Sequence, residues 1–222
     1  KLAETPNIRS ILLEARGRPT TAKTRFMSGS HQLLRLDEET TDPIGDDIAA
    51  KLLGGIAEVL PTVDIVILSD YAKGVLSDAV LRDVLDLCQE AGKTTIADPK
   101  RMDFTAYRGV TILTPNEHEV RAGTRIDAEH DADADSAGRA ALAATKGEAV
   151  LVTRSAKGLT LVRRDQPAVH LPTTAREVAD VSGAGDTLVA ALSVALGAGA
   201  SLPNAARLAN VTAGISVGKQ GT

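Results

Sequence analysis

The hydrophobic pattern of the chain alternates between short apolar runs and longer amphipathic stretches. Residues 64–68 are almost wholly apolar, as expected of a strand buried on both faces. After Ser77, apolar residues recur at positions 81, 84, 85 and 88, which predicts a helix with one buried stripe that ends at Gly92. The same alternation predicts further strands at residues 94–97, 110–113 and 149–152.

The order of these elements predicts the fold class and the place of a site. Strands that alternate with helices favour right-handed crossovers, so we expect an α/β fold with a mostly parallel sheet flanked by helices. Ligands of such sheets bind outside the carboxyl ends of the strands. Polar residues follow each predicted strand and should therefore meet at one edge, at 69–74, 98–100, 114–116 and 153–155.

The N-terminal part departs from this alternation. Alternating residues at 20–37 predict a β-hairpin that turns at 28–30. An acidic loop at 37–47 and a helix at 46–60 should follow.

The C-terminal part also changes character. After Gly158 the pattern predicts two antiparallel strands, at 159–163 and 168–171. Two alanine-rich helices, at 184–196 and 203–219, should close the chain.

The composition agrees with the predicted α/β fold and excludes several classes of protein. Hydrophobic residues make up 43% of the 222 residues and aromatic residues only 2%, so we expect a globular protein with an aliphatic core. The formal net charge of −4 argues against a nucleic-acid partner. No apolar run reaches the length of a transmembrane helix, so no membrane association is expected. The single Cys88 excludes an internal disulfide and fits a reducing cytoplasm.

One segment carries the strongest chemical signal, the string Asp-Val-Ser-Gly-Ala-Gly-Asp-Thr at residues 180–187. Small residues around Ala184 allow a sharp turn into a helix, whose first amides have no internal partner and bind phosphate oxygens. Asp186 beside such an anion site would repel phosphate. Its presence is explained if it takes a proton from an attacking hydroxyl group while the amides stabilise the transferring phosphoryl group. The alternative is a tight turn with an aspartate placed for the helix dipole.

This string resembles the C-terminal signature of the ribokinase family, also called the phosphofructokinase-B family. The resemblance implies a ribokinase-like fold in which the hairpin serves as a lid. It also implies an ATP-dependent kinase that uses Mg²⁺ and a monovalent cation. Carried over residue by residue, it makes Asp186 the catalytic base and places the anion hole at Gly183, Ala184 and Gly185.

The segment Asn116-Glu117-His118-Glu119 resembles the family's Asn-x-x-Glu motif, which organises the magnesium–phosphate end of the nucleotide. Magnesium keeps most of its waters, so Glu119 acting through water would suffice. The alternative is a capping box, with Asn116 at the helix N-cap and Glu119 three residues on. Both interpretations can hold at once.

Further nucleotide contacts follow from the same resemblance. The segment 152–158 resembles the stretch that lines the ribose and phosphates, which makes Thr153, Ser155 and Gly158 candidates, although family members often carry glycine at position 154 or 155. Asn210 and Gly214 match positions beside the adenine. Without the resemblance, both would be interpreted as residues that pack a helix.

The passages 24–25 with 32–37, 68–74 and 98–100 together resemble the heptose-phosphate kinase branch of the family. That resemblance implies phosphorylation of the anomeric hydroxyl of D-glycero-β-D-manno-heptose 7-phosphate, in lipopolysaccharide core synthesis. Basic residues suit a phosphorylated sugar, and Lys100 could neutralise phosphate as a flexible cation. The candidate substrate-binding residues are Lys23, Arg25, Arg35, Asp70, Lys100 and Asp186.

Parts of the family pattern are missing from the chain. It starts at Lys1 rather than Met, and the family's N-terminal Gly-Gly sugar motif is absent. We therefore expect a kinase domain over residues 1–222 that is incomplete at both ends. The branch implies a fused nucleotidyltransferase domain outside this chain and a homodimer formed through the hairpin.

Other functions remain open or are disfavoured. Another small-molecule kinase of the family, or a non-catalytic nucleotide-binding module, would share many of these features. No Gly-x-Gly-x-x-Gly follows the first strand, which argues against a Rossmann oxidoreductase. The acidic run at 131–135 lacks the pattern of an EF-hand and is interpreted as a solvated loop. The histidines show no zinc-ligand spacing, at His31, His118, His130 and His170.

Overall fold

The main body is a six-stranded sheet whose strands lie in the order in which they occur in the chain. The computed structural model describes residues 5, 7–29, 31–174 and 183–218. The first four strands of this sheet pair in parallel, and the fifth is antiparallel to both the fourth and the sixth. They are β3 (Ile65–Ser69), β4 (Thr94–Asp98), β5 (Ile112–Leu113), β6 (Ala149–Thr153), β7 (Leu159–Arg163) and β8 (Val169–Leu171).

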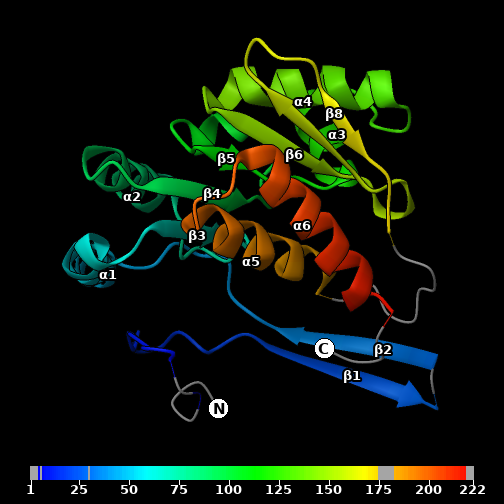
Figure 1. Ribbon diagram of the computed structural model, residues 1–222. Helices are drawn as coiled ribbons and strands as arrows, with labels where there is room; N and C mark the ends of the chain where they lie inside the picture. The colour runs from blue at the N-terminus through cyan, green and yellow to red at the C-terminus, as the bar shows by residue number, and fades with distance from the viewer. Residues whose placement is uncertain (1–4, 6, 30, 175–182, 219–222) are drawn as a thin grey trace.

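Helices cover both faces of the sheet (Figure 1). Each parallel strand is followed by its next neighbour on the same side. Because all these crossovers are right-handed, their helices lie on the same face of the sheet. These are α1 (Asp46–Val59), α2 (Asp78–Glu90), α3 (Glu117–Thr124) and α4 (Asp131–Thr145). The last two helices, α5 (Ala184–Gly197) and α6 (Leu202–Ser216), cover the other face. The described residues also form three short 3-10 helices, η2 (Leu60–Thr62), η3 (Phe104–Tyr107) and η4 (Ser155–Lys157).

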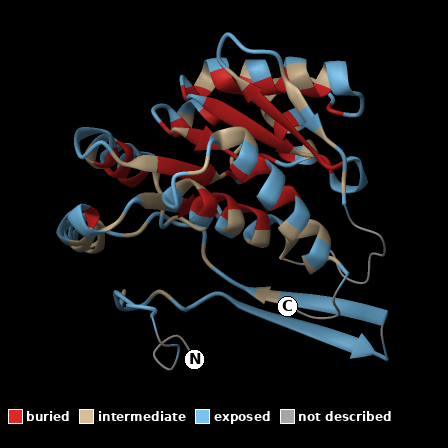
Figure 2. Cartoon of the chain, viewed as in Figure 1, coloured by how far each residue is buried: buried red, intermediate tan, exposed pale blue. Residues whose placement is uncertain are grey.

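The core consists of two layers, one on each face of the sheet, which are mainly aliphatic and also hold Phe104 and Tyr107. Strand alternation sends Val150 and Val152 into the layer under α1–α4, whereas Ala149 and Leu151 enter the layer under α5 and α6. Figure 2 shows the buried residues gathered in the sheet and on the inner sides of the helices. None of the described helices is long and apolar enough to cross a bilayer.

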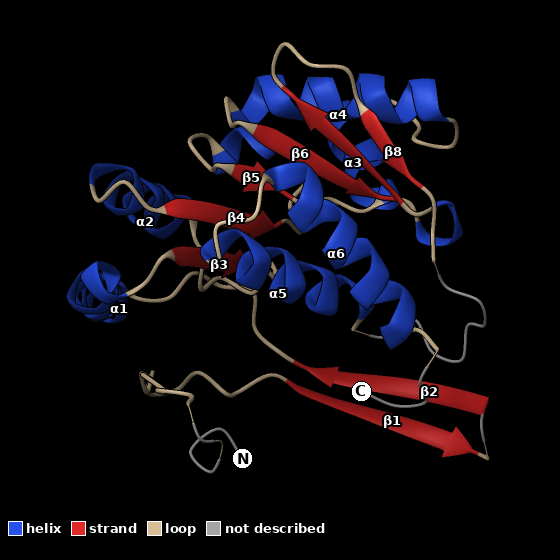
Figure 3. Ribbon diagram, in the orientation of Figure 1, coloured by secondary structure: helices blue, strands red, loops and turns tan. Residues whose placement is uncertain are grey.

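A separate two-stranded sheet lies outside this body (Figure 3). Strand β1 (Ala22–Ser28) pairs with β2 (His31–Glu38) in antiparallel register, with an irregularity between Phe26 and Met27. Nearly every residue of both strands is exposed. The predicted hairpin is confirmed. Of the turn predicted at 28–30, residue 30 lies outside the described residues.

The predicted α/β class and the mostly parallel sheet are confirmed. Ser77 caps α2 through its side chain, which accepts a hydrogen bond from the Val80 amide at 3.3 Å. The strand expected at 110–113 is shorter, and the last helix ends at Ser216 rather than at residue 219, which is outside the described residues.

The interpretation of residues 131–135 as a loop is wrong, because they form the first turns of α4. Acidic side chains at a helix N-terminus are favoured by the dipole. In addition, the Asp131 carboxylate accepts a hydrogen bond of 2.5 Å from the buried guanidinium of Arg154. That contact comes from a residue 23 positions away, so the local pattern did not indicate it.

Candidate active site

A cavity of about 420 Å³ opens where the carboxyl ends of the parallel strands meet the N-terminus of α5. Two larger hollows, of about 690 and 630 Å³, lie beside α2 and α1, but neither reaches α5. The cavity is lined by Asp70, Tyr71, Asp98, Pro99, Lys100, Thr114, Asn116, Glu119, Thr153, Gly183, Gly185, Asp186, Leu188 and Val189. The predicted meeting of the strand-end clusters at one edge is therefore confirmed.

The N-terminus of α5 forms one wall of this cavity. Gly183 is the N-cap residue with φ of +74°, and no side chain among the described residues caps the helix, so the first amides of α5 remain available to an anion. A Cβ on Gly185 would meet no atom within 4 Å. Asp186 stands exposed in the first turn. Ala184 is not among the lining residues, and residues 180–182 of the motif lie outside the described residues.

Asp98, at the carboxyl end of β4, faces two other carboxylates of the site. Burial raises its pKa to about 6, and the negative charges of Glu119 and Asp186 add to this effect. The Thr114 hydroxyl group, 3.5 Å away, and Lys100 act in the opposite direction. Such mutual repulsion makes the cavity a favourable place for a cation.

Glu119 and Asn116 are held at the start of α3 by a capping box. The Asn116 side chain accepts a hydrogen bond from the Glu119 amide at 2.9 Å, and Glu119 accepts one from the Asn116 amide at 3.0 Å. The second carboxylate oxygen of Glu119 lies 3.3 Å from the Lys100 ammonium. The capping-box interpretation is thus confirmed, and the same residues line the cavity.

Asp70 follows β3 and lines the cavity, with 6% of its surface exposed. One carboxylate oxygen accepts a hydrogen bond from the Ala72 amide at 2.7 Å. The other accepts one from Arg101 Nε at 2.9 Å and one from the Tyr107 hydroxyl group at 2.7 Å. Both oxygens therefore have protein partners.

Six candidate nucleotide-binding residues do not line the cavity, namely Glu117, His118, Ser155, Gly158, Asn210 and Gly214. Glu117 forms an exposed ion pair with Lys157 at 3.2 Å. Gly158 has φ of +86°, and a Cβ there would lie 2.0 Å from the Leu171 carbonyl oxygen, which gives it a steric reason to be glycine. The Asn210 amide donates to the Pro172 carbonyl at 2.7 Å.

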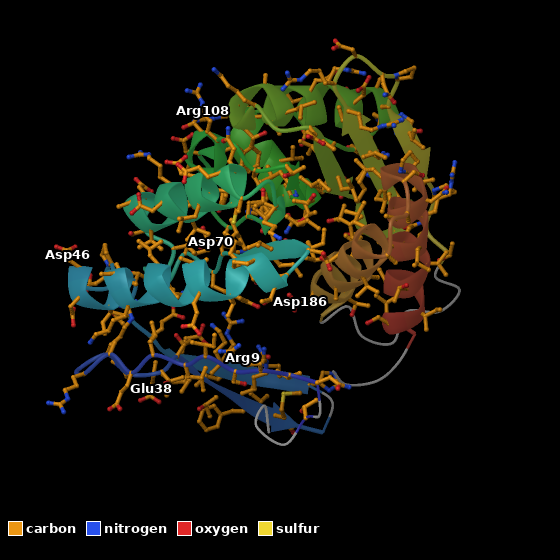
Figure 4. All side chains as sticks on the ribbon, turned by 60° about the vertical axis from the view of Figure 1, so that its left-hand side comes forward. Arg9, Glu38, Asp46, Asp70, Arg108 and Asp186 are labelled. Carbon is orange, nitrogen blue, oxygen red and sulfur yellow. The ribbon has the colours of Figure 1, made fainter. Side chains whose placement is uncertain are left out.

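The basic hairpin residues also lie away from the cavity walls. Lys23 Nζ is 3.1 Å from Asp37, and Arg35 Nε is 2.8 Å from the same carboxylate. Arg25 pairs with Arg35 across the strands. Figure 4 shows Glu38, at the end of β2, on the hairpin side of the molecule, whereas Asp70 lies within the body. The structure thus brings together Lys100, Asp70 and Asp186 but not Lys23, Arg25 and Arg35.

Several residues of the cavity wall had no role predicted from the sequence. Asp98, Pro99 and Thr114 were visible as strand-end residues, and that position was the signal that could have identified them. Tyr71 belongs to the polar loop after β3. Leu188 and Val189 belong to an apolar stretch of α5, where the sequence cannot distinguish a cavity wall from the core.

The carboxylates of the cavity suit a hydrated ion better than a closed metal site. Among the described residues, no group of three or more histidine, cysteine, aspartate or glutamate side chains could hold a metal ion. Magnesium needs only one or two carboxylates and retains several waters. Glu119 and Asp98 meet that requirement, and a cation beside them would relieve the repulsion that adds to burial in raising the pKa of Asp98.

Comparison with known proteins identifies the family of this chain. The family model described as pfkB family carbohydrate kinase matches residues 39–222. The chain is 50% identical over 206 residues to the bifunctional protein HldE of Paramagnetospirillum magneticum, covering 93% of this chain and 42% of that protein. It is 45% identical over 224 residues to bifunctional HldE of Bradyrhizobium, covering 100% of this chain and 46% of that protein. The chain thus spans less than half the length of these curated relatives.

Solved structures show the same fold. Ribokinase of Arabidopsis thaliana, complexed with ribose and ATP, superimposes with a TM-score of 0.72 at 24% identity, covering 93% of this chain and 65% of that one. Phosphofructokinase-2 of Escherichia coli in complex with potassium gives 0.73 at 19% identity, covering 91% and 65%. The predicted ribokinase-like fold is confirmed, and with a family model that matches most of its length, the chain belongs to the pfkB family of carbohydrate kinases.

Proposed function

We propose that this protein is an ATP-dependent kinase that phosphorylates the anomeric hydroxyl of D-glycero-β-D-manno-heptose 7-phosphate. The observation that carries the kinase proposal is the position of Asp186 beside uncapped amides of α5, in one cavity with Lys100 and Glu119. The heptose assignment rests on the likeness of the strand-end passages to that branch of the family. The identity of 50% to a bifunctional HldE protein supports it.

In the proposed reaction, Asp186 accepts the proton, and the amides of α5 and Lys100 stabilise the negative charge of the phosphates. Asp186 takes the proton of the sugar hydroxyl group, the oxygen of that hydroxyl group forms a bond to the γ-phosphorus, and the bond from the γ-phosphorus to the bridging oxygen of ADP breaks. The amides of Gly183, Ala184 and Gly185 stabilise the negative charge that develops on the phosphoryl oxygens. The Lys100 ammonium, close to Glu119, neutralises part of the phosphate charge.

Magnesium would be held through water by Glu119, with Asp98 as a second carboxylate nearby. When bound, the ion would neutralise phosphate charge and orient the nucleotide. Asn116 keeps Glu119 in place through the capping box. We further propose that the nucleotide extends from this edge toward Thr153, which lines the cavity.

Two proposals concern the larger assembly. The relatives are called bifunctional and are more than twice as long as this chain, which supports a fused nucleotidyltransferase domain outside it. The exposed hairpin supports a homodimer in which β1 and β2 of two copies meet.

The decisive experiment replaces Asp186 by Asn in the full-length gene product and measures turnover with ATP and the heptose phosphate. Loss of the base should lower kcat by about 10²–10⁴-fold, while ATP affinity measured by calorimetry stays nearly unchanged. Collapse of ATP binding would show that Asp186 is structural.

A panel of other family substrates tests the sugar assignment in the same assay. Fructose 1-phosphate, a nucleoside and a hydroxymethylpyrimidine are the relevant comparisons. Turnover of one of these without turnover of the heptose phosphate would exclude the heptose assignment but retain the kinase. ATP binding without turnover of any substrate would favour a non-catalytic nucleotide-binding module.

A further inference from the structure

Tyr107, the last residue of η3, has no exposed surface but carries a hydroxyl group with three polar partners. The hydroxyl donates to Asp70 Oδ2 at 2.7 Å. It lies 3.2 Å from the backbone nitrogen of Lys100 and 3.4 Å from that of Arg101, and accepts a hydrogen bond from each. A buried tyrosine usually needs one partner for its hydroxyl group, so this arrangement is more than a satisfied core residue requires.

The hydroxyl group joins two loops that border the cavity. Asp70 follows β3, and its own amide donates to the Asp98 carbonyl at 3.1 Å. The Arg101 guanidinium, which also pairs with Asp78, donates to the Asp70 carboxylate. Asp70 therefore links the loop after β3 to the loop after β4, with Tyr107 as the common contact.

The segment held by this contact carries Lys100. Pairing between β3 and β4 ends at Ser69 and Asp98, so the ladder of the sheet does not hold the backbone nitrogen of Lys100. The side chain is 56% exposed, and its ion-pair partner is Glu119. A long flexible side chain of this kind depends on its backbone for position.

The hydrogen bond to Asp70 keeps the Tyr107 hydroxyl group in one orientation. Burial raises the pKa of Tyr107, and the hydrogen bond to Asp70 raises it further, so the phenol stays protonated at physiological pH. Since its one proton goes to the Asp70 carboxylate, its lone pairs face the two backbone amides.

We propose that Tyr107 is a positioning residue for the phosphoryl transfer: its hydroxyl group, oriented by Asp70, holds the backbone of Lys100 so that the ammonium group reaches the phosphate. Asp70 then acts on Lys100 through Tyr107. This inference rests on the proposed kinase function.

The test is Tyr107→Phe in the full-length protein, which keeps the buried ring and removes only the hydroxyl group. The kcat for phosphoryl transfer should fall about tenfold, with the KM for the sugar unchanged. Lys100→Ala should also lower kcat. In the Lys100→Ala background, Tyr107→Phe should cause no further loss, because both changes remove the same contact.

Phe104→Leu is the matched control. Phe104 lies in the same 3-10 helix and is 2% exposed, but its side chain has no hydrogen-bonding group. It should lower the midpoint of thermal unfolding and leave kcat near that of the wild type. Should Tyr107→Phe not fold, Asp70→Asn replaces it, and the same non-additivity with Lys100→Ala is expected.

Several results would overturn the proposal. They are an unchanged kcat in Tyr107→Phe, losses that multiply with Lys100→Ala, or an equal loss in Phe104→Leu. A wild-type protein without any kinase turnover would overturn the proposed function itself, whereas an active wild type indifferent to Tyr107→Phe would overturn this inference alone.

Discussion

At the scale of single residues, the Asp98 carboxylate lowers the stability of the folded protein at neutral pH. Its carboxylate is partly buried and close to Glu119 and Asp186, and its pKa is raised to about 6 from an ordinary 3.8. A carboxyl group whose pKa is higher in the folded than in the unfolded state binds more protons when folded. Unfolding therefore becomes easier as the pH rises from about 4 to 6, and the cost remains in full above that range.

Replacing Asp98 by Asn should therefore stabilise the protein at pH 7. The gain should be on the order of 1–3 kcal/mol, since a tenfold change in acid strength corresponds to about 1.4 kcal/mol. It should disappear as the pH falls to about 4. Urea unfolding at pH 4, 6 and 7 measures this, with Asp83→Asn, on the exposed side of α2, as the control. A gain that is equal at all three pH values would contradict the electrostatic cause.

At the scale of elements, two glycines at the start of α5 differ in conformation and in packing, Gly183 at the N-cap and Gly185 in the first turn. Gly183 adopts φ of +74° at the N-cap, a conformation that favours glycine. Gly185 is already helical, and a Cβ there would meet open space within the cavity region. Packing against the described residues therefore gives Gly185 no reason to be glycine, whereas the phosphoryl group of the proposed reaction would need this open space.

Gly185→Ala should separate folding from activity. Alanine is favoured over glycine in a helix by up to about 1 kcal/mol, so the free energy of unfolding should stay the same or rise. The added methyl group should lower kcat/KM about tenfold or more by displacing the phosphoryl group. Gly92→Ala is the opposite control, because Gly92 has φ of +64° and lies outside the cavity. It should lower stability and leave activity intact, and full activity in Gly185→Ala would contradict the anion-hole assignment.

At the scale of the whole molecule, the hairpin is the part that the body does not stabilise. Phe26 pairs with Leu34 across the strands, and Leu36 lies on the same face. Their exposed fractions are 48%, 58% and 50%. An isolated two-stranded hairpin is marginally stable in water, so this apolar face suits contact with a second copy, as proposed.

Leu34→Glu should therefore convert a dimer to a monomer, because two like charges would meet in the apolar contact. Sedimentation velocity would measure the change in mass. Arg25→Gln, on the charged face of the same hairpin, should leave the dimer intact. A monomeric wild type would refute the dimer, and a Leu34→Glu protein that remains dimeric would place its interface elsewhere.

Much of the fold could be predicted because strands and helices have different hydrophobic periods. The buried runs at β3, β4 and β6 and the Ser77 cap of α2 depend on residues close in the chain. The start of α4 was mispredicted because it depends partly on Arg154, which is distant in sequence. For the same reason, the partners of Asp70 could not be predicted, since Arg101 and Tyr107 are 31 and 37 residues away.

The sequence by itself determined the fold class and the family, because a short motif and a local period carry that information. The same motif predicts the chemistry proposed for the start of α5. The sequence also indicated that polar residues would collect at one edge of the sheet. Only the tertiary structure decided which of them share a cavity, that Asp98 bears a raised pKa, and that Tyr107 joins two strand-end loops. These properties depend on burial and on distances between separate strands, which packing alone establishes.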